Sequence, residues 1–251
     1  MNVLKSTNTP EETTNLVNIK IWRVINDTLS KVFTFLSFWN IKINWLENID
    51  KSKNYLIIAN HPSFADWFLI RDIFLSNNIP INWIMHNSIM ESKFIWDYYR
   101  SEGHIWVLNM RSEEYYIEKW FSTKQAKLKF ESRYLKSKRI NKTAFIKSQT
   151  VLEAWWNLFI FVSWGWYKSI SDNPEVHNWY KKIVSDHLKS ADNINLLPVT
   201  IELLNWYKNG SFPFKNDVEI SFLTPLKIDN LNKFDIFNQI ELIYNPWFKN
   251  V

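Results

Sequence analysis

The most constraining feature of the chain is a short apolar run that leads directly into a histidine and an aspartate. The run Tyr55–Ala59 has the length and composition of a buried β-strand. The apolar segment from Trp67 to Leu75 is typical of a helix. We therefore predict a strand, a corner at His61 and a helix that carries Asp66 in its second turn. The connecting stretch reads Asn60-His61-Pro62-Ser63-Phe64-Ala65-Asp66.

His61 and Asp66 have the chemistry of a general-base pair. Five residues along a straight helix turn through roughly 500°, so the two side chains would point apart without a bend. The Pro62-Ser63 corner provides one, and Pro62 suits the first turn of the helix, where a missing N–H costs nothing. A carboxylate behind a His fixes its tautomer and stabilises the imidazolium. The alternative is a surface His that caps a helix beside a solvated Asp.

This stretch resembles the first motif of the glycerolipid (lysophospholipid) acyltransferase family, a His followed by four residues and an Asp. Upstream, Asn44-Trp45-Leu46-Glu47-Asn48 resembles the family's lead-in, which usually reads Gly-x-Glu-Asn. Downstream, the apolar run Asn195–Ile201, with its Pro-Val pair, resembles the fourth motif. The resemblance covers residues 40–230.

The second motif region matches the family less closely. The family has two glycines seven residues apart, followed by a strand that ends in Arg, and Trp96 and Gly103 have this spacing. The strand would be His104–Leu108, and Arg111 would be the phosphate ligand, two residues further along than usual. The alternative is a solvated Arg at the end of a strand.

The third motif region follows a buried strand predicted at Leu158–Val162. In the family this strand runs into Phe-Pro-Glu-Gly-Thr-Arg-Ser. Phe161 and Trp164 stand at the Phe and Gly positions, and Ser163 stands where the family has Glu. A nucleotide-binding P-loop fails on spacing, because Tyr167 takes its Gly position. The resemblance implies phosphate binding by Arg111, Ser163, Trp164, Gly165 and Lys168.

Glycine and tryptophan are present in unusual numbers. The chain has three Gly and fifteen Trp, whereas an average composition of about 7% Gly would give roughly 18 Gly. We hypothesise that many Trp are UGA codons that the organism reads as Gly. The alternative is a Trp-rich membrane-surface protein. The positions where the family places Gly, at least often, are Trp45, Trp96, Trp155, Trp164 and Trp179.

Residues 119–147 form a basic insertion relative to the family. They hold ten Lys or Arg and one acid, Glu131, for a net charge of +9, while the whole chain carries +5. Such a segment could meet anionic lipid headgroups or an acidic acyl carrier protein. The alternative is a solvated basic helix. Nucleic acid is disfavoured because no recognition motif accompanies the charge.

The N-terminal part of the chain divides into a tail and a helix. Apolar residues between Ile21 and Phe38 recur at helical spacing, which predicts an amphipathic helix on a membrane or one packed on the core. We predict a tail and helix over 1–39 and an acyltransferase domain over 40–251. No signal peptide or membrane-spanning run is expected. The absence of Cys and of paired His argues against a disulfide or zinc site.

The expected fold is α/β, with a mostly parallel central sheet covered by helices. The resemblance implies transfer of a fatty acyl group from acyl-CoA or acyl carrier protein to lysophosphatidate or a related precursor, with His61 and Asp66 catalytic and no metal or bound cofactor. It places the protein peripherally on the cytoplasmic face of the cell membrane. The alternative is a catalytically inactive, membrane-associated lipid-binding protein of the same fold, which the Ser163 departure favours.

Overall fold

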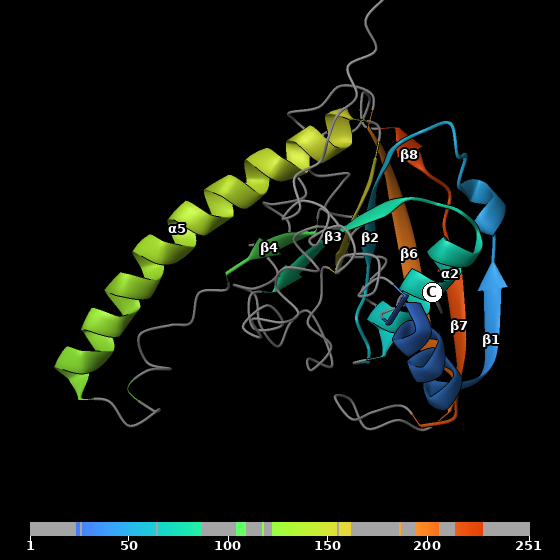
Figure 1. Cartoon of the computed structure of the whole chain (residues 1–251), viewed down its shortest axis with the longest axis horizontal. Helices are drawn as coiled ribbons and strands as arrows, with labels where there is room; N and C mark the ends of the chain where they lie inside the picture. The colour runs from blue at the N-terminus through green and yellow to red at the C-terminus, as the bar shows by residue number, and fades with distance from the viewer. Residues whose placement is uncertain are drawn as a thin grey trace, which may run out of the picture.

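The computed structural model describes residues 24–25, 27–63, 65–86, 104–108, 117, 122–154, 156–161, 186, 194–205 and 214–227. These residues build one eight-stranded sheet with helices on both faces (Figure 1). The strand order is β1-β7-β6-β2-β5-β3-β4, and β8 pairs with β6. The strands are β1 Phe38–Asn44, β2 Tyr55–Ala59, β3 Ile81–His86, β4 Ile105–Val107, β5 Asn157–Phe161, β6 Asn195–Leu203, β7 Asn216–Phe222 and β8 Leu226–Lys227.

The predicted mostly parallel sheet is confirmed. Neighbouring strands from β6 through β2, β5 and β3 to β4 all pair in parallel. The antiparallel pairs are β6 with β7 and β6 with β8. Strand β2 is buried along its whole length at the centre of this sheet. A central parallel strand is covered on both faces, which explains why the run Tyr55–Ala59 is continuously apolar rather than alternating.

Two helices cover opposite faces of the sheet. Helix α2, Asp66–Ser76, connects β2 to β3, and helix α5, Thr123–Glu153, connects β4 to β5. These two connections step across the sheet in opposite directions, so right-handed crossovers place their helices on opposite faces. Figure 1 shows this arrangement, with the sheet between α2 and α5. On the α2 face, the helix residues Leu69 and Phe74 join a buried cluster with Ile57, Phe159 and Phe222.

An N-terminal helix packs against α2. Residues 24–25 and 27–37 are helical, and the chain enters β1 at Phe38, which the apolar stripe had assigned to the helix. Two contacts attach it to α2: the rings of Phe33 and Phe68 stack with centroids 4.5 Å apart, and Arg71 Nη2 donates to Asp27 Oδ1 at 2.8 Å. The Arg71 side chain is only 4% exposed and its charge is balanced by Asp27, whose own side chain is 35% exposed.

Trp45, between β1 and the 3₁₀ turn Leu46–Asn48, has a left-handed backbone with φ 57° and ψ 34°. A side chain with a Cβ is disfavoured there, whereas Gly adopts this conformation readily. The resemblance had placed a family Gly at this position. The backbone at residue 45 therefore fits glycine better than tryptophan.

Candidate active site

His61 and Asp66 meet at the carboxyl-terminal end of β2. The Nδ1 atom of His61 lies 3.2 Å from Oδ2 of Asp66. The predicted meeting of the two residues is therefore present, but the helix starts later than expected. Helix α2 begins at Asp66 itself, so Pro62 precedes the helix, and the chain bends at Ser63 and turns at Ala65. The bend brings the imidazole back over the first turn of the helix.

Asp66 is held by more than the imidazole. Its carboxylate is 0% exposed and accepts the backbone N–H of Ser63 at 2.7 Å and the Ser63 hydroxyl. The carboxylate also occupies the first turn of α2, where the helix dipole favours a negative charge. These contacts satisfy a charge that burial would otherwise penalise. The carboxylate is thus fixed in place and directed at Nδ1 of His61.

The imidazole is packed as well as hydrogen-bonded. The ring of His61 stacks on Phe161, with centroids 4.3 Å apart and planes 20° apart. Phe161 is the last residue of β5, which pairs in parallel with β2, so both strands end at the same edge of the sheet. In open α/β sheets, ligands bind at this carboxyl edge. The His61 side chain retains 22% exposure there, enough to be reached by a substrate.

Asn60 ties the corner to the neighbouring strand. Its side-chain amide donates to the C=O of Ile201 at 2.8 Å, and its Oδ1 accepts the N–H of Ile201 at 2.7 Å. Neither this contact nor the stacking of Phe161 on His61 was anticipated from the sequence. The signals were the Asn directly before the His and the aromatic residue at the strand end, but their spatial partners are distant along the chain.

The proposed phosphate ligands Arg111, Ser163, Trp164, Gly165 and Lys168 lie outside the described residues. The strands that precede three of the sequence motifs nevertheless end at the same edge of the sheet. Strand β4 ends four residues before Arg111, and β5 ends two residues before Ser163. Both strands run parallel to β2. The described site is therefore the pair His61 and Asp66 with its supporting residues Asn60, Ser63 and Phe161.

A buried carboxylate that orients an imidazole at the carboxyl edge of a mostly parallel sheet defines an α/β protein with a candidate general base. The chain matches the acyltransferase family over residues 40–200. This match covers more than half of the chain, so the protein belongs to the acyltransferase family, and the resemblance to glycerolipid acyltransferases is confirmed.

The solved structures agree on the fold. The chain is similar to the crystal structure of the 1-acyl-sn-glycerophosphate (LPA) acyltransferase PlsC from Thermotoga maritima, with a TM-score of 0.55 and 15% sequence identity. The alignment covers 97% of this chain and 83% of that chain. At this identity the likeness establishes the architecture alone. A comparison with curated proteins gave no match.

Proposed function

We propose that the protein transfers a fatty acyl group from a thioester, either acyl-CoA or acyl carrier protein, to a hydroxyl of lysophosphatidate or a related glycerophospholipid precursor. The observation that carries the proposal is the 3.2 Å contact between His61 Nδ1 and the buried carboxylate of Asp66. With the Nδ1 proton directed at Asp66, the neutral ring presents the Nε2 lone pair for proton abstraction.

The reaction needs no metal and no covalent enzyme intermediate. His61 Nε2 takes the proton of the acceptor hydroxyl as its oxygen attacks the thioester carbonyl. The tetrahedral intermediate then collapses and breaks the C–S bond, and the imidazolium returns the proton to the departing thiolate. Asp66 stabilises the imidazolium between these steps. Arg111, Ser163, Trp164, Gly165 and Lys168 remain our candidates for binding the phosphate of the acceptor.

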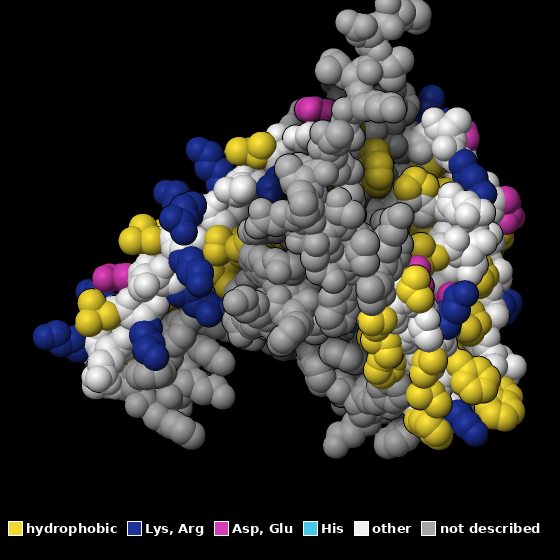
Figure 2. All heavy atoms as spheres, viewed as in Figure 1, with side chains coloured by type: hydrophobic (Ala, Val, Ile, Leu, Met, Phe, Trp, Pro, Cys, Tyr) yellow, Lys and Arg dark blue, Asp and Glu magenta, His cyan; other side chains and the backbone are white. Residues whose placement is uncertain are grey.

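We also propose that the N-terminal helix contacts a membrane, which would keep the protein peripherally on the cytoplasmic face. The outer side of residues 24–37 carries a row of exposed apolar residues, and Phe35 is 80% exposed. Figure 2 shows a continuous apolar area over this part of the molecule. Such an area is larger than the scattered apolar side chains of an ordinary surface. Its members are Val24, Ile25, Leu29, Val32, Phe35, Leu36 and Trp39. No helix within the described ranges is long and apolar enough to cross a bilayer.

The test is a thioester-consumption assay on purified variants. His61→Ala should lower the turnover number roughly 10²- to 10⁴-fold, the usual contribution of a general base. Asp66→Asn should lose a comparable factor because the amide no longer fixes the tautomer. Circular dichroism should show unchanged folding. Turnover near that of the unmodified protein in His61→Ala would contradict the proposal, and absence of activity in the unmodified protein would favour an inactive lipid-binding protein.

A further inference from the structure

Helix α5 has two faces of different kinds. One face carries buried side chains that recur at helical spacing, and the second half of this face packs on β4 and β5. These are Ala126, Ser137, Ala144, Ser148 and Leu152. The opposite face carries Leu128, Leu135 and Ile146, all exposed. The spacings of seven and eleven residues correspond to two and three helical turns, so the three side chains form one line. Leu135 is 67% exposed.

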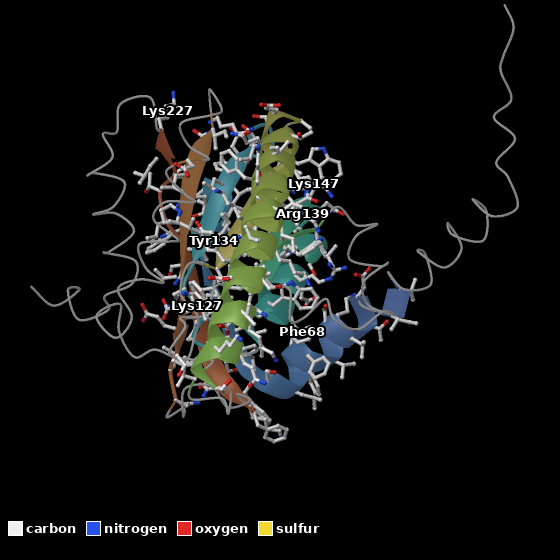
Figure 3. The ribbon with its side chains drawn as sticks, turned by 90° about the vertical axis from the view of Figure 1, so that its left-hand side faces the viewer. Phe68, Lys127, Tyr134, Arg139, Lys147 and Lys227 are labelled. Atoms are coloured by element: carbon white, nitrogen blue, oxygen red, sulfur yellow. The ribbon has the colours of Figure 1, made fainter. Side chains whose placement is uncertain are left out.

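Strong positive charge flanks this apolar line. Helix α5 carries nine Lys or Arg and two Glu, a net charge of +7, which exceeds the +5 of the whole chain. Figure 2 shows basic and apolar side chains interspersed along this flank, and Figure 3 labels Lys127, Arg139 and Lys147 along the helix. Lys136, Arg139 and Lys142 are exposed neighbours at i,i+3 spacing. Like charges at this spacing destabilise a helix, so an acidic partner would relieve the repulsion.

The first half of α5 extends past the edge of the sheet where His61 lies. Near its C-terminal end, the C=O of Leu152 accepts from Asn54, just before β2 begins. Further up the helix, the side chain of Asn141 exchanges two hydrogen bonds with the backbone of Leu108, just after β4 ends. Residues 123–141 therefore project beyond this edge for about 27 Å, at 1.5 Å per residue (Figure 1).

The strand register shows how far the projecting part of α5, residues 123–141, lies from the candidate active site. Leu108 and His61 lie at about the same level of the sheet, three strand spacings apart, which is about 14 Å. A carrier bound along the first half of α5 could therefore deliver a group on a flexible arm to His61. The pairs that set this level are Val107 with His86, Ile84 with Ile160, and Phe161 with Ala59.

The position of the two surfaces distinguishes a protein partner from a membrane. The apolar N-terminal helix packs on α2, and α2 and α5 lie on opposite faces of the sheet (Figure 1). The outer face of α5 is therefore a surface separate from the apolar N-terminal helix. A basic face with an apolar line then fits an acidic, soluble protein, because charged groups select the partner while apolar residues supply the buried centre of an interface.

We propose that the outer face of α5 docks an acidic acyl carrier protein, which makes the carrier-bound thioester the acyl donor. This inference rests on the proposed acyl transfer at His61. The carrier binds over Leu128 and Leu135, with its acidic side chains against Lys136, Arg139 and Lys142. Its pantetheine arm then crosses the sheet edge to His61.

The experiment compares three donors of one acyl chain at a fixed acceptor concentration: acyl carrier protein, acyl-CoA and acyl-pantetheine. The test variant is Lys136→Glu with Arg139→Glu, on the outer face of α5. The matched control is Lys51→Glu with Lys227→Glu, which makes the same change in net charge away from α5. The test variant should raise the KM for acyl carrier protein about tenfold or more, while the other two donors change less than twofold. The control should leave all three unchanged.

Salt and the apolar line give independent readouts. For the unmodified protein, raising the ionic strength from about 0.01 M to about 0.15 M should raise the KM for acyl carrier protein, because the screening length falls from about 30 Å to about 8 Å. This dependence should weaken in the test variant. Leu135→Ala should raise the same KM without changing its salt dependence.

Four outcomes would overturn the inference. Equal increases in KM for acyl-CoA and acyl carrier protein, with acyl-pantetheine unchanged, would mean that α5 binds the phosphate of the phosphopantetheine arm that both donors carry. An unchanged KM for acyl carrier protein, with weaker binding to vesicles that contain phosphatidylglycerol, would assign α5 to the membrane. Activity with acyl-CoA but none with acyl carrier protein would reject the docking and leave the proposed function intact. Failure with all three donors would reject the proposed function and the docking that rests on it.

Discussion

The side-chain amide of Asn60 pairs with both backbone groups of Ile201, through hydrogen bonds of 2.8 and 2.7 Å. Strands β2 and β6 pair in parallel up to Ala59 and Val199, so the Asn60 amide extends the connection between them past the end of the ladder. The residue immediately before His61 is thereby attached to the strand that resembles the fourth motif. This attachment fixes where the corner leaves the sheet.

Asn60→Ala should lower kcat with little change in KM. An unpaired donor or acceptor at a part-buried site costs about 1–3 kcal/mol. If His61 is misplaced and this cost is added to the activation free energy, kcat falls about 5- to 150-fold. The matched control is Asn157→Ala. The amide of Asn157 makes the same kind of bridge at the other end of the sheet, between the N–H of Tyr55 and the C=O of Pro80. The control should lose stability while kcat stays within a few-fold, and equal kcat losses in both variants would contradict a positioning role.

Ser63→Ala should impair catalysis by loosening Asp66. The hydroxyl of Ser63 donates to Oδ1 of Asp66, and hydrogen bonds to charged groups contribute about 1.5–3 kcal/mol. We expect kcat to fall about 10- to 100-fold, and Ser63→Thr, which keeps the hydroxyl, to recover most of the loss. Ser148→Ala is the control, because that buried hydroxyl bonds only within α5, to the C=O of Ala144, among the contacts described. A Thr variant as impaired as the Ala variant would argue against the hydroxyl.

Asp27→Ala should destabilise the fold by about 2 kcal/mol, because it leaves the buried Arg71 guanidinium without its carboxylate. The measurement is the free energy of unfolding in urea. Lys42→Ala, which breaks an exposed ion pair with Glu219, should cost less than about 1 kcal/mol. A loss in Asp27→Ala no larger than in the control would show that the N-terminal helix is held to α2 by its apolar contacts alone.

Trp45→Gly should stabilise the chain by about 1 kcal/mol, because it removes a Cβ from a left-handed backbone position. Trp106→Gly is the opposite control, since Trp106 pairs in register within β4, where Gly costs about 0.5–1 kcal/mol before any loss of packing. Thermal unfolding of both variants gives the comparison. Destabilisation by both substitutions would contradict a glycine preference at position 45.

The same reasoning predicts that the protein made in its own organism has Gly at most of the fifteen Trp positions. Trp164→Gly with Trp166→Gly should restore phosphate binding, although these residues lie outside the described ranges. Trp83 differs from Trp45 in that its ring is buried beside Phe159, where a large side chain fits. Its indole N–H nevertheless has no hydrogen-bond partner among the described residues. Peptide mass spectrometry of native protein decides the question, and Trp at 45, 96 and 164 would reject the hypothesis.

The strands and the catalytic pair could be predicted because their signals are local. Buried strands such as β2 and β5 are recognisable in the sequence as short apolar runs. The bend that joins His61 to Asp66 lies within seven consecutive residues. The exact start of α2 could not be predicted. A helix that starts near Pro62 and a helix that starts at Asp66 both satisfy the local sequence preferences. The structure has the second start, with a backbone hydrogen bond from the N–H of Asp66 to the C=O of Ser63.

By itself, the sequence determined the apolar runs, the His-to-Asp spacing, the basic charge of the 119–147 segment and the excess of Trp over Gly. Only the tertiary structure decided which groups meet across the sheet. The contacts of Asn60 with Ile201 and of His61 with Phe161 join residues 141 and 100 positions apart. No local propensity encodes such a pairing, because it depends on strand order and register. The same order, through right-handed crossovers, placed α2 and α5 on opposite faces and so separated the apolar N-terminal surface from the basic one.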